Sequence, residues 1–217
     1  MASAKEIIAK RAAQELKDGD VVNLGIGLPT MVANYVPSNV HIVLQSENGI
    51  LGMGEMAQPG EEDKDIINSG FQYVHVNSGA SFFDSATSFG IIRGGHVDVT
   101  ILGALQVDET GTLASHIVPG RMVSGMGGAM DLVVGSKKVI VVTTHTNKEV
   151  PKLLKKVVLP VTALNKVNLI ITELAVIEVT NKGFLLREIH QDTTLEQVKA
   201  FTGAELTVAD DLRIMNV

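Results

Sequence analysis

The chain has 217 residues, no cysteine and a formal net charge of −6 at neutral pH. The charge argues against nucleic-acid binding, which requires clustered basic residues, and the lack of cysteine excludes disulfides and thiolate metal sites. No apolar run approaches the roughly 18 residues that a membrane span requires.

At this length we expect one domain, over residues 1–217, with a substantial core. Its hydrophobic content of 45%, with 21 glycines and eight methionines, is high for the surface of a lone small domain. We therefore expect partner chains to cover part of that surface. The first residues lead into a helical pattern without a signal peptide, which predicts a cytoplasmic protein.

Short branched runs alternate with helical patterns along the chain. The predicted strands are four to six residues long: Val21–Leu24, His41–Leu44, Gln72–Val76, Val97–Leu102, Val139–Thr143, Leu169–Thr172, Ala175–Val179 and Phe184–Ile189. The predicted helices begin at capping or turn residues: after Ser3, near Pro29, after Asp84, near Ala129 and after Thr194. This alternation predicts an α/β fold with a mostly parallel, open sheet flanked by helices.

Two further segments are predicted to lack regular structure. The glycine- and methionine-rich stretch over 49–60 is expected to be a long loop. The acidic run over 61–65 is expected to be a solvated face.

The stretch Gln45-Ser46-Glu47-Asn48-Gly49 places one carboxylate directly after a predicted strand. In open α/β sheets ligands bind beyond the carboxyl ends of the strands, and an ionised carboxylate can act as a nucleophile without a base. Glu47 is therefore a candidate nucleophile, and a solvated loop carboxylate or a helix-cap partner is the alternative. A two-carboxylate hydrolase that pairs it with Asp63 or Asp65 would also need residues that hold a sugar, and none is evident.

Two glycine-rich segments can bring backbone N–H groups close to a ligand or a developing anion. The first, Gly25-Ile26-Gly27-Leu28-Pro29, lacks the third glycine of the dinucleotide-binding pattern. The second is the stretch Gly120–Gly128. The six histidines form no i,i+4 pair and no carboxylate triad, so neither a metal site nor a Ser-His-Asp triad is predicted. His96 is expected to be a structural histidine.

Several blocks, in a fixed order over residues 5–214, form a family signature. They are 25–29, Ser46-Glu47-Asn48-Gly49, Ser88-Phe89, 92–96, 102–107 and 125–132. Together they resemble the 3-oxoacid type of family I coenzyme A transferases over essentially the whole chain. Within that family the chain is similar to the glutamate-bearing B, or beta, subunit of a two-subunit enzyme.

The resemblance implies a reaction, a partner and a set of site residues. The enzyme would move coenzyme A between a short-chain acyl-CoA and a carboxylic acid such as acetoacetate, through an anhydride and a glutamyl-CoA thioester on Glu47. The implied oxyanion-hole candidates are Asn23 and Gly128, and the implied substrate-binding candidates are Gly25, Gly27, Asn48, Gly49 and Gly127. No tightly bound cofactor or metal is expected, because the coenzyme A thioester is the substrate. The implied partner is a homologous A, or alpha, subunit in an α2β2 assembly, without nucleic acid or membrane.

The chain departs from the family pattern at two places. Ala114-Ser115-His116 stands where many members have Ala-Asn-Trp, and Thr144-His145 stands where many have Glu-His. Neither place touches the nucleophile motif, so both bear on substrate preference. The stretches 145–148 and 172–179 resemble members that use acetoacetate with butyrate or acetate more than the succinyl-CoA members. Five lysines are expected to form a solvated face, with contact to coenzyme A phosphates as the alternative: Lys148, Lys152, Lys155, Lys156 and Lys166.

Two other functions stay open on the sequence alone. A sugar-phosphate isomerase or deaminase of similar architecture requires a phosphate-binding loop, and the stretch 25–29 offers no hydroxyl group before Thr30. A non-catalytic assembly subunit would have no use for an intact Glu47, and a thioester adduct on the chain would exclude it. The sequence does not distinguish the physiological pair of acids, the direction of transfer or the stoichiometry.

Overall fold

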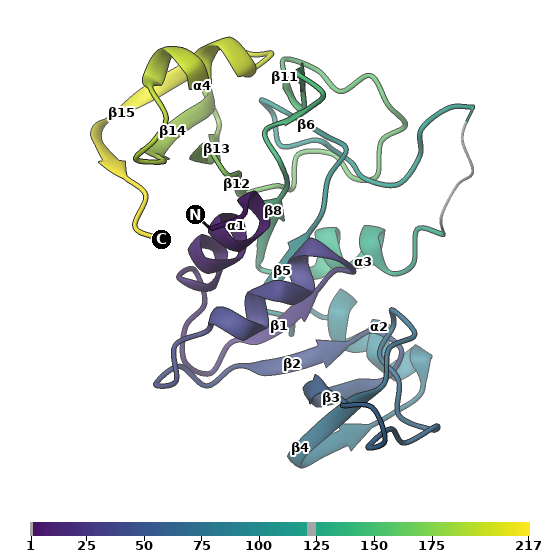
Figure 1. Cartoon of the computed structure of the whole chain (residues 1–217). Coiled ribbons are helices and arrows are strands. Elements are labelled where there is room, and N and C mark those ends of the chain that lie inside the picture. The colour runs from purple at the N-terminus through teal and green to yellow at the C-terminus, as the bar shows by residue number, and fades with distance from the viewer. Residues whose placement is uncertain (1, 121–124) are drawn as a thin grey trace.

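The computed structural model describes residues 2–120 and 125–217, and one large sheet organises it (Figure 1). Within the described residues this sheet has ten strands. From one edge to the other they are β15 (Leu206–Ile214), β14 (Gly183–Ile189), β13 (Ala175–Thr180), β12 (Leu169–Ile171), β8 (Lys138–Val142), β5 (Val99–Leu102), β1 (Val21–Leu24), β2 (Val43–Ser46), β3 (Ile50–Met56) and β4 (Val74–Phe82). The central strands β12, β8, β5, β1 and β2 are parallel, and antiparallel pairs flank them. The predicted α/β fold with a mostly parallel sheet is confirmed.

Shorter elements complete the described part of the chain. The small strands are β6 (Gln106–Asp108), β7 (Leu113–Ala114), β9 (Thr146–Asn147), β10 (Val150–Pro151) and β11 (Leu153–Leu154). The helices are α1 (Ala4–Ala13), the 3₁₀ helix η1 (Leu28–Tyr35), α2 (Ser85–Arg93), α3 (Ala129–Gly135) and α4 (Leu195–Phe201). Among the described residues, no helix combines the length and apolar character that crossing a membrane requires.

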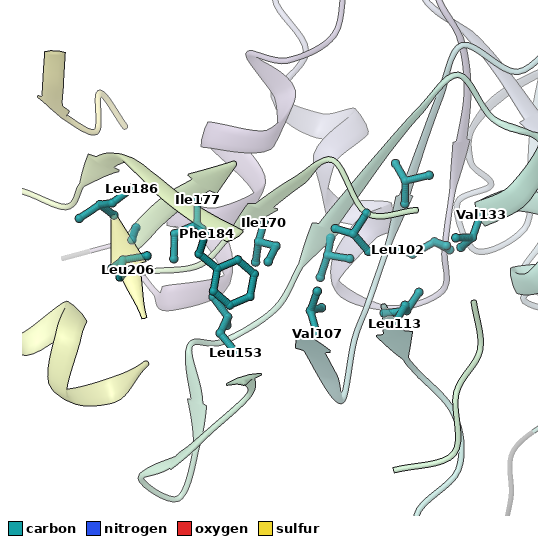
Figure 2. Close-up of a cluster of buried hydrophobic side chains, with 14 of the residues drawn as sticks. Leu102, Val107, Leu113, Val133, Leu153, Ile170, Ile177, Phe184, Leu186 and Leu206 are labelled. Atoms are coloured by element: carbon teal, nitrogen blue, oxygen red, sulfur yellow. The ribbon is translucent and has the colours of Figure 1, made fainter. Parts of the chain in front are cut away.

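The two faces of the sheet bury alternate residues of the same strands. Along β8, Val139 and Val141 belong to one hydrophobic cluster, whereas Ile140 and Val142 belong to another. This alternation follows from the two-residue period of a strand, and the run is branched throughout because both faces are covered. Figure 2 shows the first cluster, in which Phe184 lies beside Ile170 of β12, Ile177 of β13 and Leu153 of β11.

Helices α1 and η1 cover one face of the sheet, and α2 and α3 cover the opposite face (Figure 1). Ile8 and Ala12 of α1 belong to the second cluster, whereas Ile92 of α2 packs with Leu132 of α3 in a third. The predicted capping residues are confirmed for three helices: Ser3 for α1, Asp84 for α2 and Thr194 for α4. Each side chain accepts a hydrogen bond from a backbone N–H of the first turn, which would otherwise lack a partner.

The prediction of a loop over 49–60 is wrong, because most of this stretch is strand β3. Its glycines are sites of close packing against β4. A Cβ at Gly52 would lie 3.0 Å from the Cα of Ala80, and one at Gly54 would lie 3.1 Å from the carbonyl oxygen of His75. Glycine inside a strand often marks such an approach or a bulge, and the register of β3 shifts twice along this pair.

Other elements also differ from the predictions, among them β4, which was predicted over Gln72–Val76 and runs over Val74–Phe82. The strand predicted over His41–Leu44 is shifted by two residues and runs as β2 over Val43–Ser46. Its last two residues are polar, and they belong to the strand because they pair with neighbouring strands. The second predicted helix is the 3₁₀ helix η1, which buries Pro29 and Val32 at a spacing of three. Strand β15 was not predicted, because Asp210, Asp211 and Arg213 interrupt its apolar residues and it lacks a branched run.

The structural histidine is His145 rather than His96, so that prediction is wrong. His96 is exposed, whereas His145 is buried with its two ring nitrogens 2.9 and 3.0 Å from the hydroxyls of Thr172 and Thr202. A neutral imidazole can satisfy both hydroxyls, which donate or accept as required. Burial lowers the pKa of His145 to about 4.

We predict that His145 makes folding stability dependent on pH. The unfolded chain binds this proton with an ordinary pKa of about 6.5. The contribution of neutral His145 to the free energy of unfolding is fully present above pH 6.5. It is lost as the pH falls toward about 4, which lowers the free energy of unfolding by up to ~3 kcal/mol. Urea unfolding between pH 7.5 and 4.5 should therefore show a weaker pH dependence for His145→Gln than for the wild type. Replacement of the exposed His41 by Gln is the control, and an equal flattening in both variants would contradict the assignment.

Candidate active site

Glu47 lies where the sheet ends on the side of the carboxyl termini of its parallel strands. Strand β2 ends at Ser46, and Glu47 begins the tight turn that leads into β3 at Ile50. The side chain is half-buried and the following Asn48 is exposed. The predicted position of Glu47 at the carboxyl end of a strand is confirmed, and it is the position at which open α/β sheets bind ligands.

An amide from the neighbouring strand holds one oxygen of this carboxylate. Asn23 of β1 is buried and stands opposite Gln45 in the parallel register of β1 and β2. Its Nδ2 donates to Gln45 Oε1 at 2.7 Å, to the Gln45 carbonyl at 3.1 Å and to Glu47 Oε2 at 3.3 Å. Gln45 Nε2 in turn donates to Ser88 Oγ of α2 at 3.0 Å. A connected line of side chains therefore runs from α2 through two strands to Glu47.

Asn23 makes these contacts while its other polar atom stays unpaired. Its buried Oδ1 has no hydrogen-bond partner among the described residues. A buried acceptor without a partner costs about 1–3 kcal/mol. The orientation persists because a flipped amide would present its oxygen to three acceptors, two on Gln45 and one on Glu47. The amide nitrogen of Asn23 is therefore directed toward the carboxylate, while its amide oxygen has no hydrogen-bond partner among the described residues.

The second glycine-rich segment packs against the same carboxylate from the other side. A Cβ at Gly128 would lie 3.2 Å from Glu47 Cγ and 3.3 Å from Cζ of Phe89. One at Gly127, where φ is +56°, would lie 3.8 Å from Glu47 Oε1. Gly128 is buried and is the N-cap of α3, so the predicted helix near Ala129 is confirmed. Residues 121–124 of the predicted glycine-rich stretch lie outside the described residues.

The other predicted site residues have structural partners. The N–H of Gly25 donates to the Ile101 carbonyl, and a Cβ there would lie 2.9 Å from Leu102 Cδ2. Gly49 is buried with φ of +124°, and its N–H donates to the Ser46 carbonyl. The Gly49 contact closes the turn that carries Glu47, whereas the Gly25 contacts join the end of β1 to β5. The proposed roles of these two glycines in substrate binding stay predictions.

The two remaining candidates are exposed. Gly27 has φ of +87°, and its carbonyl accepts from the N–H and the hydroxyl of Thr30. The side chain of Asn48 donates to the Ile67 carbonyl at 2.7 Å, while Ser46 Oγ accepts from the N–H of Ser69. The segment around 67–69 is thus fixed to the turn that carries Glu47. For Gly27 and Asn48, substrate binding also stays a prediction.

A cavity of about 810 Å³ opens beside this turn, on the face that carries η1. It lies between η1 and strands β2–β4, and its wall includes Ile26, Ser46 and Met53. The charged or titratable side chains on its described wall are Glu55, His41 and His75, and none is a lysine or arginine. The described part of this wall therefore offers no permanent cation for an anionic ligand.

Both departures from the family pattern lie away from the described contacts of Glu47. The hydroxyl of Ser115 lies 2.8 Å from that of Thr162. Thr144 accepts a hydrogen bond from Nζ of Lys152, which also donates to Thr143. Burial lowers the pKa of Lys152. The predicted solvated face is wrong for this half-buried lysine and correct for the other four, which are exposed.

Sequence reasoning quoted Gln45, Ser88 and Phe89 only as parts of motifs and assigned them no role. Gln45 has a simple signal, because it precedes Glu47 by two residues and the side chains of alternate strand residues point to the same face. The contact between Ser88 and Gln45 depends on how α2 packs on β2, and the sequence carries no pattern for it.

The geometry defines a carboxylate between an oriented amide and two glycines at the end of a parallel sheet. The family model for coenzyme A transferases matches residues 5–200, and the chain belongs to this family. Family membership also decides against the sugar-phosphate isomerase or deaminase.

Curated relatives match the chain along nearly its whole length. The beta subunit of the acetate CoA-transferase of Haemophilus influenzae is 51% identical over 216 residues, which cover 99% of this chain and 96% of that protein. The B subunit of the succinyl-CoA:3-ketoacid coenzyme A transferase of Helicobacter pylori is 51% identical over 205 residues, covering 94% of this chain and 99% of that protein. The two relatives carry different substrate names at equal identity.

A solved structure confirms the fold. The acyl-CoA transferase apoenzyme from Escherichia coli O157:H7 superposes with a TM-score of 0.80 at 23% identity. The match covers 99% of this chain but only 43% of that one. More than half of that polypeptide therefore has no counterpart in this chain.

We predict that Gly128→Ala lowers transferase turnover by about 10-fold. Its Cβ, 3.2 Å from Glu47 Cγ, would push that side chain away, and even a small displacement of a reacting group lowers the rate, since 1 Å can cost about 100-fold. Gly125→Ala is the matched control, because a Cβ at Gly125 meets nothing within 4 Å among the described residues. Turnover should be measured beside thermal unfolding. Near-normal turnover in Gly128→Ala, or an equal loss in both variants, would show that this segment does not confine Glu47.

Proposed function

We propose that this chain is the nucleophile-bearing subunit of a 3-oxoacid coenzyme A transferase, with Glu47 as the nucleophile. The observation that carries the proposal is the environment of Glu47. One oxygen accepts from Asn23, and the other lies beside the backbone of Gly127, where a Cβ would be 3.8 Å away. In a member of the coenzyme A transferase family, this is a carboxylate prepared to attack an acyl-CoA.

The first step forms an anhydride. Oε1 of Glu47 attacks the thioester carbonyl of the acyl-CoA, the carbon–sulfur bond breaks, and coenzyme A leaves as the thiolate. The negative charge in the tetrahedral intermediate lies on the former thioester oxygen. The backbone N–H of Gly128 is the proposed donor for it, because the glycine backbone lies on the Oε1 side of Glu47. Losing one such donor typically costs about 2.7–4 kcal/mol of transition-state stabilisation, a factor of 10²–10³ in rate.

The second step transfers coenzyme A to the enzyme. The thiolate attacks the Glu47 carbonyl carbon, and the bond from that carbon to Oε1 breaks. The first acid leaves with Oε1, and a glutamyl-CoA thioester remains. The developing oxyanion is now Oε2, which is the atom that Asn23 Nδ2 contacts. The acceptor acid runs both steps in reverse, so its own oxygen restores the carboxylate of Glu47.

The proposed substrates are a short-chain acyl-CoA and a carboxylic acid such as acetoacetate. The stretches 145–148 and 172–179 favour acetate- or butyrate-type partners over succinyl-CoA, and the relative from Haemophilus influenzae carries an acetate name. Ser115, His116 and Thr144 have their described hydrogen bonds away from Glu47, so we infer that they influence substrate choice indirectly.

We propose that the active assembly requires a homologous A subunit, as α2β2. Curated relatives are named as beta or B subunits, and a solved single-chain transferase has more than half of its length outside the match. The surface carries exposed apolar side chains that suit a partner, such as Phe71 at 85% exposure and Ile26 at 69%.

The test of Glu47 is its covalent adduct. Incubating the assembled enzyme with an acyl-CoA, without acceptor acid, should leave coenzyme A on the chain as a thioester visible by intact mass. Glu47→Ala should abolish both adduct and turnover, and Glu47→Asp should cost orders of magnitude because its carboxylate is one methylene short. Glu55→Gln is the control, since Glu55 is an exposed carboxylate on the following strand, β3. An adduct that persists in Glu47→Ala would overturn the mechanism, and absence of any adduct in the wild type would favour a non-catalytic role for the chain.

The partner is tested by reconstitution. The purified chain alone should show no measurable transfer, and addition of the A subunit should restore turnover with saturation at a fixed molar ratio. Light scattering of the saturated mixture should give the mass of two copies of each chain. Full turnover from the single chain would contradict the two-subunit assignment.

A further inference from the structure

We propose that Gln45 is a positioning residue that, supported by Ser88, keeps the amide of Asn23 turned toward Glu47. The inference rests on the proposed function of Glu47 and adds residues to which no role has been assigned. Its basis is the line of hydrogen bonds Ser88–Gln45–Asn23–Glu47, with successive lengths of 3.0, 2.7 and 3.3 Å.

The contact lengths show which neighbour controls the Asn23 amide. The bond to Gln45 Oε1 is the shortest of the three that Asn23 Nδ2 makes, and the bond to Glu47 is the longest. Gln45 is 1% exposed and Ser88 is fully buried, so water does not compete for these groups. The amide of Asn23 is thus held mainly by Gln45, and its contact with Glu47 is the longest of the three.

The unpaired Oδ1 of Asn23 supports the same assignment independently. A buried amide chosen for stability alone would satisfy both of its polar atoms, and orphaned buried groups in native structures call for a functional explanation. Here the alternative orientation would turn the amide oxygen toward Glu47 Oε2. In the thioester-forming step that atom gains negative charge, so the flipped amide would repel the oxyanion that the observed one stabilises.

Gln45 can hold this orientation because both ends of its own amide have a partner. Gln45 Nε2 donates to the Ser88 hydroxyl, which presents the amide oxygen of Gln45 toward Asn23. Without Gln45 Oε1, only the Gln45 backbone carbonyl and the carboxylate itself would hold the Asn23 nitrogen. The line therefore fixes the donor before substrate binds, which is the preorganisation that oxyanion stabilisation requires.

The first variant removes the amide while keeping its length. In the assembled enzyme, Gln45→Met should lower kcat by about 10- to 100-fold and slow formation of the thioester adduct equally, with KM for the acyl-CoA changed less than about threefold. The matched control is Thr100→Val, which removes a buried hydroxyl from the residue paired with Asn23 on its other side in β5. The Thr100 hydroxyl has no hydrogen-bond partner among the described residues, so its loss should leave kcat within about twofold.

The second variant separates positioning from a structural role. Gln45→Glu keeps an acceptor toward Asn23, and the Ser88 hydroxyl can reverse to donate to the other oxygen. It also places a second carboxylate one amide away from Glu47, and neighbouring carboxylates resist simultaneous ionisation. The acid limb of the kcat/KM profile should therefore move to higher pH, an effect that a loss of stability would not produce.

The outcomes distinguish this inference from the function on which it rests. If wild type forms the adduct, Gln45→Met forms it at the same rate and the Gln45→Glu profile keeps its acid limb, Gln45 is structural and the inference is wrong. If Gln45→Met merely lowers Tm while kcat per folded enzyme stays normal, the inference is also wrong. If the wild type itself forms no adduct on Glu47, the proposed function fails first and the positioning role fails with it.

Discussion

The parallel register of β1 and β2 is the constraint on which the site depends. It sets Asn23 opposite Gln45, and it ends β2 so that Glu47 follows directly at the carboxyl edge of the sheet. A shift of one residue would turn the Asn23 side chain to the other face. The amide would then point toward α1 and η1 instead of α2 and the carboxylate. The hydrophobic core fixes this register, because Val22 must enter the cluster under α1 while its neighbours face the opposite side.

Glycines determine what surrounds the carboxylate. Gly128 lets the segment before α3 reach the side chain of Glu47, and Gly49 lets the turn pass beneath the Phe83 carbonyl, where a Cβ would lie only 2.0 Å away. The high glycine content is therefore a packing requirement at least as much as a source of backbone donors. The result is a glycine backbone beside Oε1 and an amide donor at Oε2, which matches the different fates of the two oxygens in the proposed mechanism.

Much of the fold could be predicted because its signals are local. The branched runs of β8 and β12, and the capping residues Ser3, Asp84 and Thr194, each indicate their structure within a few positions. Strand β3 was missed because its glycines imitate a loop, and they serve instead to pack against β4. Strand β15 was missed because pairing with β14, rather than its own composition, makes it a strand.

The candidate site was also predicted in part, where its signals are local or belong to the family pattern. Glu47 could be placed from the strand that precedes it, and Asn23 and Gly128 from family resemblance, and the structure brings all three together. Gln45 and Ser88 could not be given a role, because their contact joins residues 43 positions apart through the packing of α2 on β2.

In the proposed mechanism Glu47 exchanges an oxygen with the acids between which coenzyme A moves. This exchange is tested most directly by running the assembled enzyme with an acceptor acid labelled with ¹⁸O in both carboxylate oxygens, then isolating the peptide that contains Ser46-Glu47-Asn48. We predict one ¹⁸O atom in the Glu47 carboxylate after a turnover, and none in the same peptide when acyl-CoA is omitted. An unlabelled Glu47 after many turnovers, or label found only on another residue or in water, would contradict the assignment of Glu47 as the nucleophile.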